Sequence, residues 1–211
     1  MTDLAAGPPA DPAPWATSGA SVPPQRKPRK IFLLVGLAAA AALGVGLFTS
    51  AGTAKGTGPP HAGGPVPSFT APRLIGSGTV SVPADGGGGG TPAVLIFFGA
   101  WCSSCKAELP PLAATVRHQD AVGGSLGKVR VIGVDSEDST SIGRAFVTSE
   151  GIGFPVARDP GIAILSGEYY FDGDPNTVFV KGDGTISAIV PGALSVAKLT
   201  AEEKKLIPSE S

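Results

Sequence analysis

Gly99-Ala100-Trp101-Cys102-Ser103-Ser104-Cys105-Lys106 is the stretch that decides the fold of this 211-residue chain. It holds the only two cysteines of the sequence, with two residues between them. An apolar run of strand length, residues 94–98, comes directly before it. Apolar residues at helical spacing follow it: Leu109, Leu112, Ala113 and Val116. A Cys-x-x-Cys pair where a strand turns into a helix is typical of thiol–disulfide exchange.

The position of each cysteine predicts its part in such an exchange. Cys102 would lie at the start of the helix, where unpaired backbone N–H groups and the helix dipole stabilise a thiolate. It is therefore expected to be the attacking thiol. Cys105 lies about one turn further on and is expected to resolve the mixed disulfide by attacking the Cys102 sulfur, which closes a Cys102–Cys105 disulfide.

Two other interpretations of the cysteine pair are weaker. A purely structural disulfide across two intervening residues closes a very small loop and stabilises the chain little. A zinc site needs about four ligands, and His61 and His118 are the only histidines. The first lies in a predicted linker and the second near a predicted helix end. Redox catalysis without metal or organic cofactor is the favoured hypothesis.

The N-terminal part of the chain carries a membrane signal. Residues 31–48 form an uncharged apolar run that as a helix would span roughly 27 Å. Four basic residues precede it within residues 26–30 and would keep that side in the cytoplasm. We predict an uncleaved transmembrane signal-anchor helix, with the following domain outside the cytoplasm. A cleaved signal peptide is the alternative, although residues 1–25 would make a long leader.

Composition divides the rest of the chain. The Pro- and Ala-rich residues 1–30 are predicted to form a disordered cytoplasmic tail, and residues 49–65 a Gly/Pro-rich linker. Residues 66–211 suit one domain. The formal net charge of −1 gives no general attraction to nucleic acid.

Within the domain, the hydrophobic pattern predicts four strands, three helices and a short helical piece. Two strands flank the first helix, and a hairpin followed by a helix closes the chain, which implies an α/β fold with a central mixed sheet and helices on both faces. Ser195 is a plausible N-cap of the closing helix. The predicted strands are 94–98, 129–134, 177–180 and 186–190, and the predicted helices 102–118, 140–149, 162–165 and 196–206.

These residues resemble thioredoxin-fold proteins, and more narrowly the membrane-anchored TlpA/ResA-like redoxins of bacteria. The resemblance covers roughly residues 66–207. It rests on these segments: Pro67-Ser68-Phe69, Phe98 to Pro110, Val131 to Asp135, Gly153 to Val156, Asp159-Pro160, Gly173 to Thr177, and Gly192 to Ser195. Trp-Cys-x-x-Cys with a proline five residues later and a downstream Gly-x-Pro-x-Thr makes the resemblance specific.

The resemblance implies further site residues. Pro175 matches the cis-proline of the family, so residue 174 would present its backbone to an extended substrate, with the Asp174 carboxylate close to the Cys102 thiolate. Glu108 matches the acid one turn past the second cysteine and would exchange protons with Cys105. Trp101 is expected to shield one flank of the sulfurs and offer an apolar contact to partners.

Two further features of the sequence concern acidic residues near the site. Position 96 is Ile, where cytoplasmic thioredoxins carry a buried Asp. The acidic run Asp135-Ser136-Glu137-Asp138 looks like a cation site. Because it follows a strand and precedes a helix, helix capping and a solvated loop explain it better.

The resemblance also implies a function. We expect a membrane-anchored extracytoplasmic thiol–disulfide oxidoreductase that reduces disulfides of exported proteins or of apocytochrome c in cytochrome c maturation. A membrane electron-donor protein would recharge it. The alternatives are a disulfide oxidase or isomerase for exported proteins, a thiol peroxidase, and a binding module that keeps the fold without the chemistry.

Overall fold

The computed structural model describes residues 58–83, 89–124 and 126–207. The predicted tail, the predicted membrane span at 31–48 and most of the predicted linker lie outside these ranges. Within them, every helix falls short of the length and apolar character that a membrane crossing requires.

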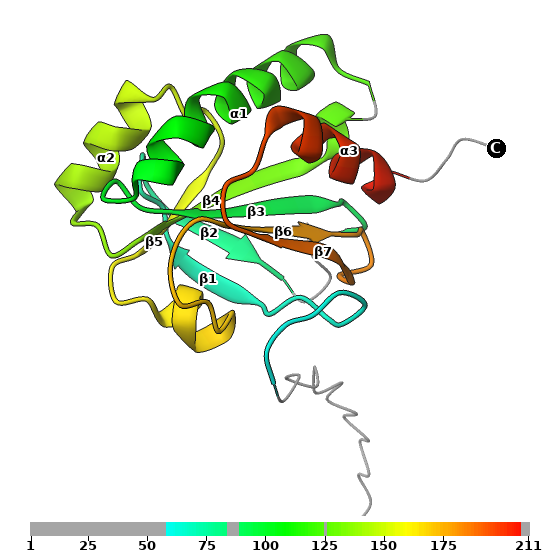
Figure 1. Ribbon diagram of the computed structural model, residues 1–211, viewed down its shortest axis with the longest axis horizontal. Coiled ribbons are helices and arrows are strands. Elements are labelled where there is room, and N and C mark those ends of the chain that lie inside the picture. Colours follow the sequence, from blue (N-terminus) through cyan, green and yellow to red (C-terminus); the bar gives the residue numbers. More distant parts are fainter. Residues whose placement is uncertain (1–57, 84–88, 125, 208–211) are drawn as a thin grey trace, which may run out of the picture. The chain divides into compact units, whose positions relative to one another are not determined.

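A five-stranded mixed sheet forms the centre of the described unit, in the order β5-β4-β3-β6-β7 (Figure 1). β3 runs parallel to β4, and β4 parallel to β5, whereas β6 is antiparallel to both β3 and β7. The strand bounds are β3 (Ala93–Phe98), β4 (Arg130–Ser136), β5 (Val156–Asp159), β6 (Asn176–Val180) and β7 (Ile186–Pro191). The predicted central mixed sheet is confirmed, and β5 adds a short strand that the hydrophobic pattern does not predict.

Strand β3 is buried on both faces, and this explains its unbroken apolar sequence. Val94, Ile96 and Phe98 join one hydrophobic core. The alternate residues Ala93, Leu95 and Phe97 join the other. A strand with no solvent-facing side reads as a continuous apolar run because successive side chains point to opposite, equally buried faces.

Helices α1 (Ser103–Val122), α2 (Thr140–Ser149) and α3 (Val196–Leu206) contribute to the first core. Their buried members in this core include Cys105, Leu109, Leu112, Phe146 and Leu199. Helix α1 runs four residues beyond its predicted end, although Pro110 and Pro111 remove two internal hydrogen bonds. Its apolar face, packed on the sheet, supplies the stability that these bonds would have given.

The second face of the sheet carries a β-hairpin and one short helix (Figure 1). The hairpin pairs β1 (Phe69–Pro72) with β2 (Thr79–Val82). The helix is a single π-helical segment, η2 (Ala163–Glu168). Asp159 binds its start, because the Oδ2 atom accepts from the backbone N–H groups of Ile164 at 3.0 Å and Leu165 at 2.8 Å.

The folded unit begins before the predicted boundary at residue 66. The backbone N–H of Gly63 donates to the carbonyl of Ile186 at 2.8 Å, and that of Val66 donates to the carbonyl of Gly184 at 2.9 Å. These bonds cover the outer edge of β7, which would otherwise expose unpaired backbone groups. The last residues of the predicted linker are therefore part of the fold.

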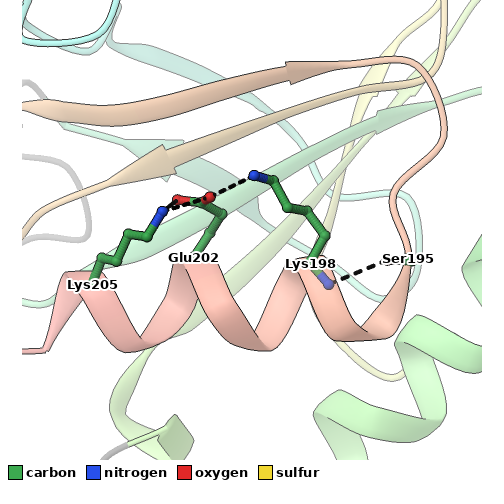
Figure 2. Close-up of polar contacts among 4 residues, drawn as sticks. All are labelled: Ser195, Lys198, Glu202 and Lys205. Atoms are coloured by element: carbon green, nitrogen blue, oxygen red, sulfur yellow. Dashed lines mark hydrogen bonds and ion pairs between the residues drawn. The ribbon is translucent and has the colours of Figure 1, made fainter.

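Helix α3 shows the predicted cap and an ion-pair network (Figure 2). The Ser195 hydroxyl accepts from the Lys198 backbone N–H at 3.2 Å, which confirms it as the N-cap. The Glu202 carboxylate lies 2.8 Å from the Nζ atoms of both Lys198 and Lys205. Hydrogen bonds from these lysines hold the pKa of Glu202 below its ordinary value.

Replacing Asp159 with alanine is expected to lower the free energy of unfolding by about 3 kcal/mol, because two buried N–H groups would lose their acceptor. Urea denaturation followed by circular dichroism measures the change. Asp183→Ala is the matched control, since this exposed aspartate accepts from the Thr185 N–H in a surface turn. Equal losses in the two variants would contradict the assigned role of Asp159.

Candidate active site around Cys102 and Cys105

The first sulfur lies at the N-cap of helix α1. Cys102 has an extended backbone, and its Sγ accepts from the backbone N–H of Cys105 at 3.1 Å. The two cysteines form a disulfide. Cys102 is 5% exposed and Cys105 is fully buried. A partner can therefore reach only the first sulfur, and the helix amide beside it favours negative charge there.

Trp101 lies outside the sulfur pair with half of its surface exposed. Its indole N–H donates to the carbonyl of Ser136 at 3.3 Å, and the side chain is 51% exposed. The ring folds back over Gly99, where any Cβ would overlap it. Gly99 is thus required by close approach, and the exposed half of the ring faces solvent beside the disulfide turn.

The loop before β6 reaches the disulfide because β6 pairs antiparallel with β3. Phe97 pairs with Asn176, so the start of β6 and the end of β3 share one sheet edge. The Asp174–Pro175 peptide bond in this loop is cis. The carbonyl oxygen of Asp174 lies 3.7 Å from Cys102 Sγ. The two segments that the family resemblance connects are therefore in contact.

The Asp174 side chain is not freely solvated. Burial and the negative charge of the nearby Glu137 raise the pKa of Asp174 to about 7. A carboxyl that ionises only near neutrality opposes the Cys102 thiolate less strongly than an ordinary aspartate would.

Glu108 lies inside the core on the same helix face as Cys105. It is buried, and its Oε2 accepts from the Leu194 backbone N–H at 2.5 Å. Its Oε1 has no hydrogen-bond partner among the described residues. Burial raises the pKa of Glu108 to about 7, and the bond from Leu194 opposes the increase. A carboxyl that titrates near neutrality one helical turn from a thiol can take up and return a proton.

The acidic run covers the end of β4 and the start of the loop after it, and it differs from its prediction. Asp135 is 1% and Asp138 is 6% exposed, so the expected solvated loop is wrong for these two acids, whereas Glu137 is exposed. Ser139, the residue after the run, caps helix α2, because its hydroxyl accepts from the Ile142 backbone N–H. Asp138 instead accepts from the backbone N–H of Ala100 at 2.6 Å. In the part of the chain that the structure describes, no three His, Cys, Asp or Glu side chains are grouped to bind a metal ion.

Three features of the site are absent from the sequence interpretation: the crowding at Gly99, the bond from Leu194 to Glu108, and the bond from Ala100 to Asp138. The last two join residues 86 and 38 positions apart. Only the crowding has a local signal, since Gly99 directly precedes the Ala-Trp-Cys turn.

Glu108→Gln is expected to stabilise the domain at high pH. The folded pKa of Glu108, about 7, exceeds the ordinary 4.5. The folded state therefore binds the proton more tightly, and wild-type stability falls as pH rises from the lower to the higher value. Gln cannot ionise and keeps an acceptor for Leu194. The gain over wild type is expected to grow from near zero at pH 4 to on the order of 2 kcal/mol at pH 8.

Thermal melts between pH 4 and 8 measure this difference. Glu202→Gln is a control with the opposite pH dependence. Because the folded state lowers the pKa of Glu202, its carboxylate stabilises the fold at pH values above the ordinary pKa. That variant should lose stability at pH 8 and match wild type near pH 3. A pH-independent effect of Glu108→Gln would show that its carboxyl is not a neutral buried acid.

Known proteins similar to this chain include thiol–disulfide oxidoreductases. A model described as the AhpC/TSA family matches residues 62–189. Thiol-disulfide oxidoreductase ResA of Bacillus subtilis is 26% identical over 122 residues, which are 58% of this chain and 65% of ResA. Soluble secreted antigen MPT53 of Mycobacterium tuberculosis is 30% identical over 118 residues, 56% of this chain and 61% of the antigen. The chain thus spans less than two thirds of the length of these relatives.

Solved structures agree on the fold. A secreted disulfide oxidoreductase of Mycobacterium tuberculosis is 25% identical with a TM-score of 0.54, covering 65% of this chain and 96% of that one. StoA from Bacillus subtilis, 21% identical with a TM-score of 0.54, covers 66% of this chain and 98% of its own. The described unit has the thioredoxin-like α/β fold, and because the family model matches more than half of its residues, the chain belongs to the AhpC/TSA family.

Proposed function

We propose that this chain is a membrane-anchored extracytoplasmic thiol–disulfide oxidoreductase that reduces disulfides of exported proteins. The observation that carries the proposal is the position of Cys102, whose sulfur accepts from the Cys105 amide at the start of α1 while its partner sulfur is buried. The names of the matched relatives support the same chemistry: ResA is called a thiol-disulfide oxidoreductase.

The exchange proceeds in two displacements. The Cys102 thiolate attacks one sulfur of the substrate disulfide, forms a mixed disulfide and releases the other substrate sulfur as a thiolate. The Cys105 thiolate then attacks Cys102 Sγ, closes the Cys102–Cys105 disulfide and releases the second substrate thiolate. Two electrons pass from the cysteine pair to the substrate. A dithiol donor returns the pair to its reduced form by the reverse steps.

Glu108 is proposed as the proton partner of Cys105. Before the second displacement, Cys105 must lose its proton within a buried environment. The Glu108 carboxylate, three residues further along α1, accepts that proton and returns it when the pair is reduced again. Its pKa of about 7 leaves both forms populated at neutral pH.

The loop at Pro175 is proposed as the substrate platform. The carbonyl of Asp174 lies 3.7 Å from Cys102 Sγ, so a peptide that pairs with this backbone is aligned with the attacking sulfur. The exposed Trp101 ring offers an apolar contact beside it. Trp101, Asp174 and Pro175 would bind substrate, whereas Cys102, Cys105 and Glu108 carry out the reaction.

The membrane anchor and the direction of electron flow rest on the sequence. Residues 31–48 supply an uncharged apolar run after basic residues. The resemblance to TlpA/ResA-like redoxins favours reduction, with apocytochrome c among the substrates and a membrane protein as electron donor. The fold suits a tethered domain, because residues 63–66 join β7 beside Ile186, whereas the Pro191 end of β7 pairs with Asn176 near the active site. Residues 63–66 thus lie at the sheet end opposite to Cys102.

Cys105→Ser is expected to trap substrates, because the mixed disulfide on Cys102 then has no resolving thiol. Non-reducing electrophoresis of cells that express the variant should show adducts that disappear with dithiothreitol. Cys102→Ser is the control and should show none. The Cys102–Cys105 reduction potential decides the direction: a value near those of strong disulfide oxidants would assign the chain to oxidation instead. Absence of adducts, together with no insulin reduction by the folded wild type, would reject the proposed activity.

The full-length chain is expected to sediment with membranes and to resist extraction with high salt, since an apolar span inserts in the hydrocarbon core. A chain lacking residues 1–48 should be soluble. Cell fractionation and mass measurement of the mature N-terminus test this. A soluble product shortened between residues 48 and 60 would identify a cleaved signal peptide in place of an anchor.

A further inference from the structure

Two buried carboxyl groups at the end of β4 and in the loop after it have no part in the exchange described above. Asp135 is the sixth residue of β4, and Asp138 lies in the loop that follows. They are 1% and 6% exposed, respectively. Burying two carboxylates side by side without a cation between them is costly, so their arrangement requires a physical explanation.

We propose that Asp135 and Asp138 are positioning residues for Cys102: a proton shared between their carboxyl groups keeps the pair together, and the pair holds the turn that presents the attacking sulfur. This inference rests on the proposed exchange function. It adds a second group of residues, besides Glu108, whose protonation affects the reaction of Cys102.

Asp138 is hydrogen-bonded directly to the turn that precedes Cys102. Asp138 Oδ2 accepts from the backbone N–H of Ala100 at 2.6 Å, two residues before Cys102. The adjoining Ser136 carbonyl accepts from the Trp101 indole at 3.3 Å. The loop after β4 therefore fixes the turn at two successive residues. Since Ala100 is buried, loss of the acceptor would leave its N–H unpaired and release the turn.

The shared proton follows from the contact between the carboxyl groups. Asp138 lies close enough to Asp135 to act on its pKa as a hydrogen-bonding neighbour, and two carboxyl groups can bond to each other only if one is protonated. Burial, that bond and the Asp138 charge raise the pKa of Asp135 to about 8. The Asp135 carboxyl packs directly against α2 at Gly143, where a Cβ would overlap it.

The charges around the pair are mostly negative. Arg158 on β5 is the cation that lowers the pKa of Asp135, whereas Asp174, in the loop before β6, raises it. Glu137 and Asp159 add negative charge around Asp174. Helix α2 contributes only the uncharged Gly143 at this contact. Loss of the shared proton therefore leaves both carboxyl groups negatively charged. The two carboxylates repel each other, and the added negative charge opposes a thiolate on Cys102.

The experiment measures how fast dithiothreitol reduces the oxidised domain between pH 6.5 and 9, followed by tryptophan fluorescence. The ratio of variant to wild-type rates at each pH removes the ionisation of dithiothreitol itself. Asp135→Asn places a permanent N–H donor where the shared proton lies. Its ratio should be within about twofold of unity at pH 6.5 and rise to about threefold or more at pH 9.

Asp138→Ala removes the acceptor for Ala100 and should react about tenfold more slowly at every pH. Asp138→Asn restores an acceptor and should recover most of that rate. Ser139→Ala is the matched control, because it weakens the adjoining start of α2 without touching the pair. Its ratio should remain near unity throughout.

A flat ratio for Asp135→Asn, or wild-type rates in folded Asp138→Ala, would overturn the proposal. If Asp138→Ala does not fold, the pH dependence of Asp135→Asn decides. Carboxyl carbon NMR of the wild type at pH 6.5 tests the shared proton without any exchange reaction, and two ionised groups there would also overturn it. Failure of the wild type to react with dithiothreitol would instead reject the proposed function.

Discussion

The burial of β3 on both faces is the constraint on which the active site depends. All six of its residues are fully buried, so the strand cannot shift by one residue without moving every side chain to the wrong core. Its last residue, Phe98, therefore has a fixed position. Helix α1 begins only five residues later, and the short turn between them must deliver Cys102 to the helix start. The neighbouring strands bring the loop at Pro175 and the loop at Asp138 to the same edge.

This edge collects acids that change charge near neutral pH. Glu108 lies on helix α1, three residues past Cys105, and Asp135 lies on strand β4. Burial is the largest cause of the raised pKa of each. Disulfide reduction consumes protons as well as electrons, so groups of this kind connect the chemistry to pH. Position 96, where the family resemblance points to an aspartate in cytoplasmic thioredoxins, is an isoleucine packed in the core here.

The sequence predicts the elements with strong local signals and misses contacts made over long separations. The apolar run at β3, the helical spacing of α1 and the Ser195 cap are all encoded within a few residues. β5 is a four-residue strand with no alternation of its own, and its identity comes from pairing with β4. The acids at 135 and 138 look solvated in sequence because acidic residues usually are. The buried Asp138 accepts from the Ala100 amide, 38 residues away, a contact that no local pattern encodes.

Buried polar atoms without hydrogen-bond partners lie mostly near the active site, where they lower the stability of the fold. Among the described residues, buried side-chain atoms without a hydrogen-bond partner include atoms of Glu108, Asp135, Ser136, Arg158 and Thr177. Four of these five residues lie on β4, β5 or β6 near the edge that faces the disulfide, and Glu108 lies one turn past it. Asp174 beside the site adds two more such oxygens, whereas far from the site Glu203 has one, its Oε1, and its Oε2 accepts from the Gln119 amide at 2.8 Å. Buried polar groups that lack partners normally destabilise a fold. Their concentration beside one reactive sulfur pair indicates that stability is given up where charge must change during the reaction, and that the two hydrophobic cores supply the excess that makes this possible.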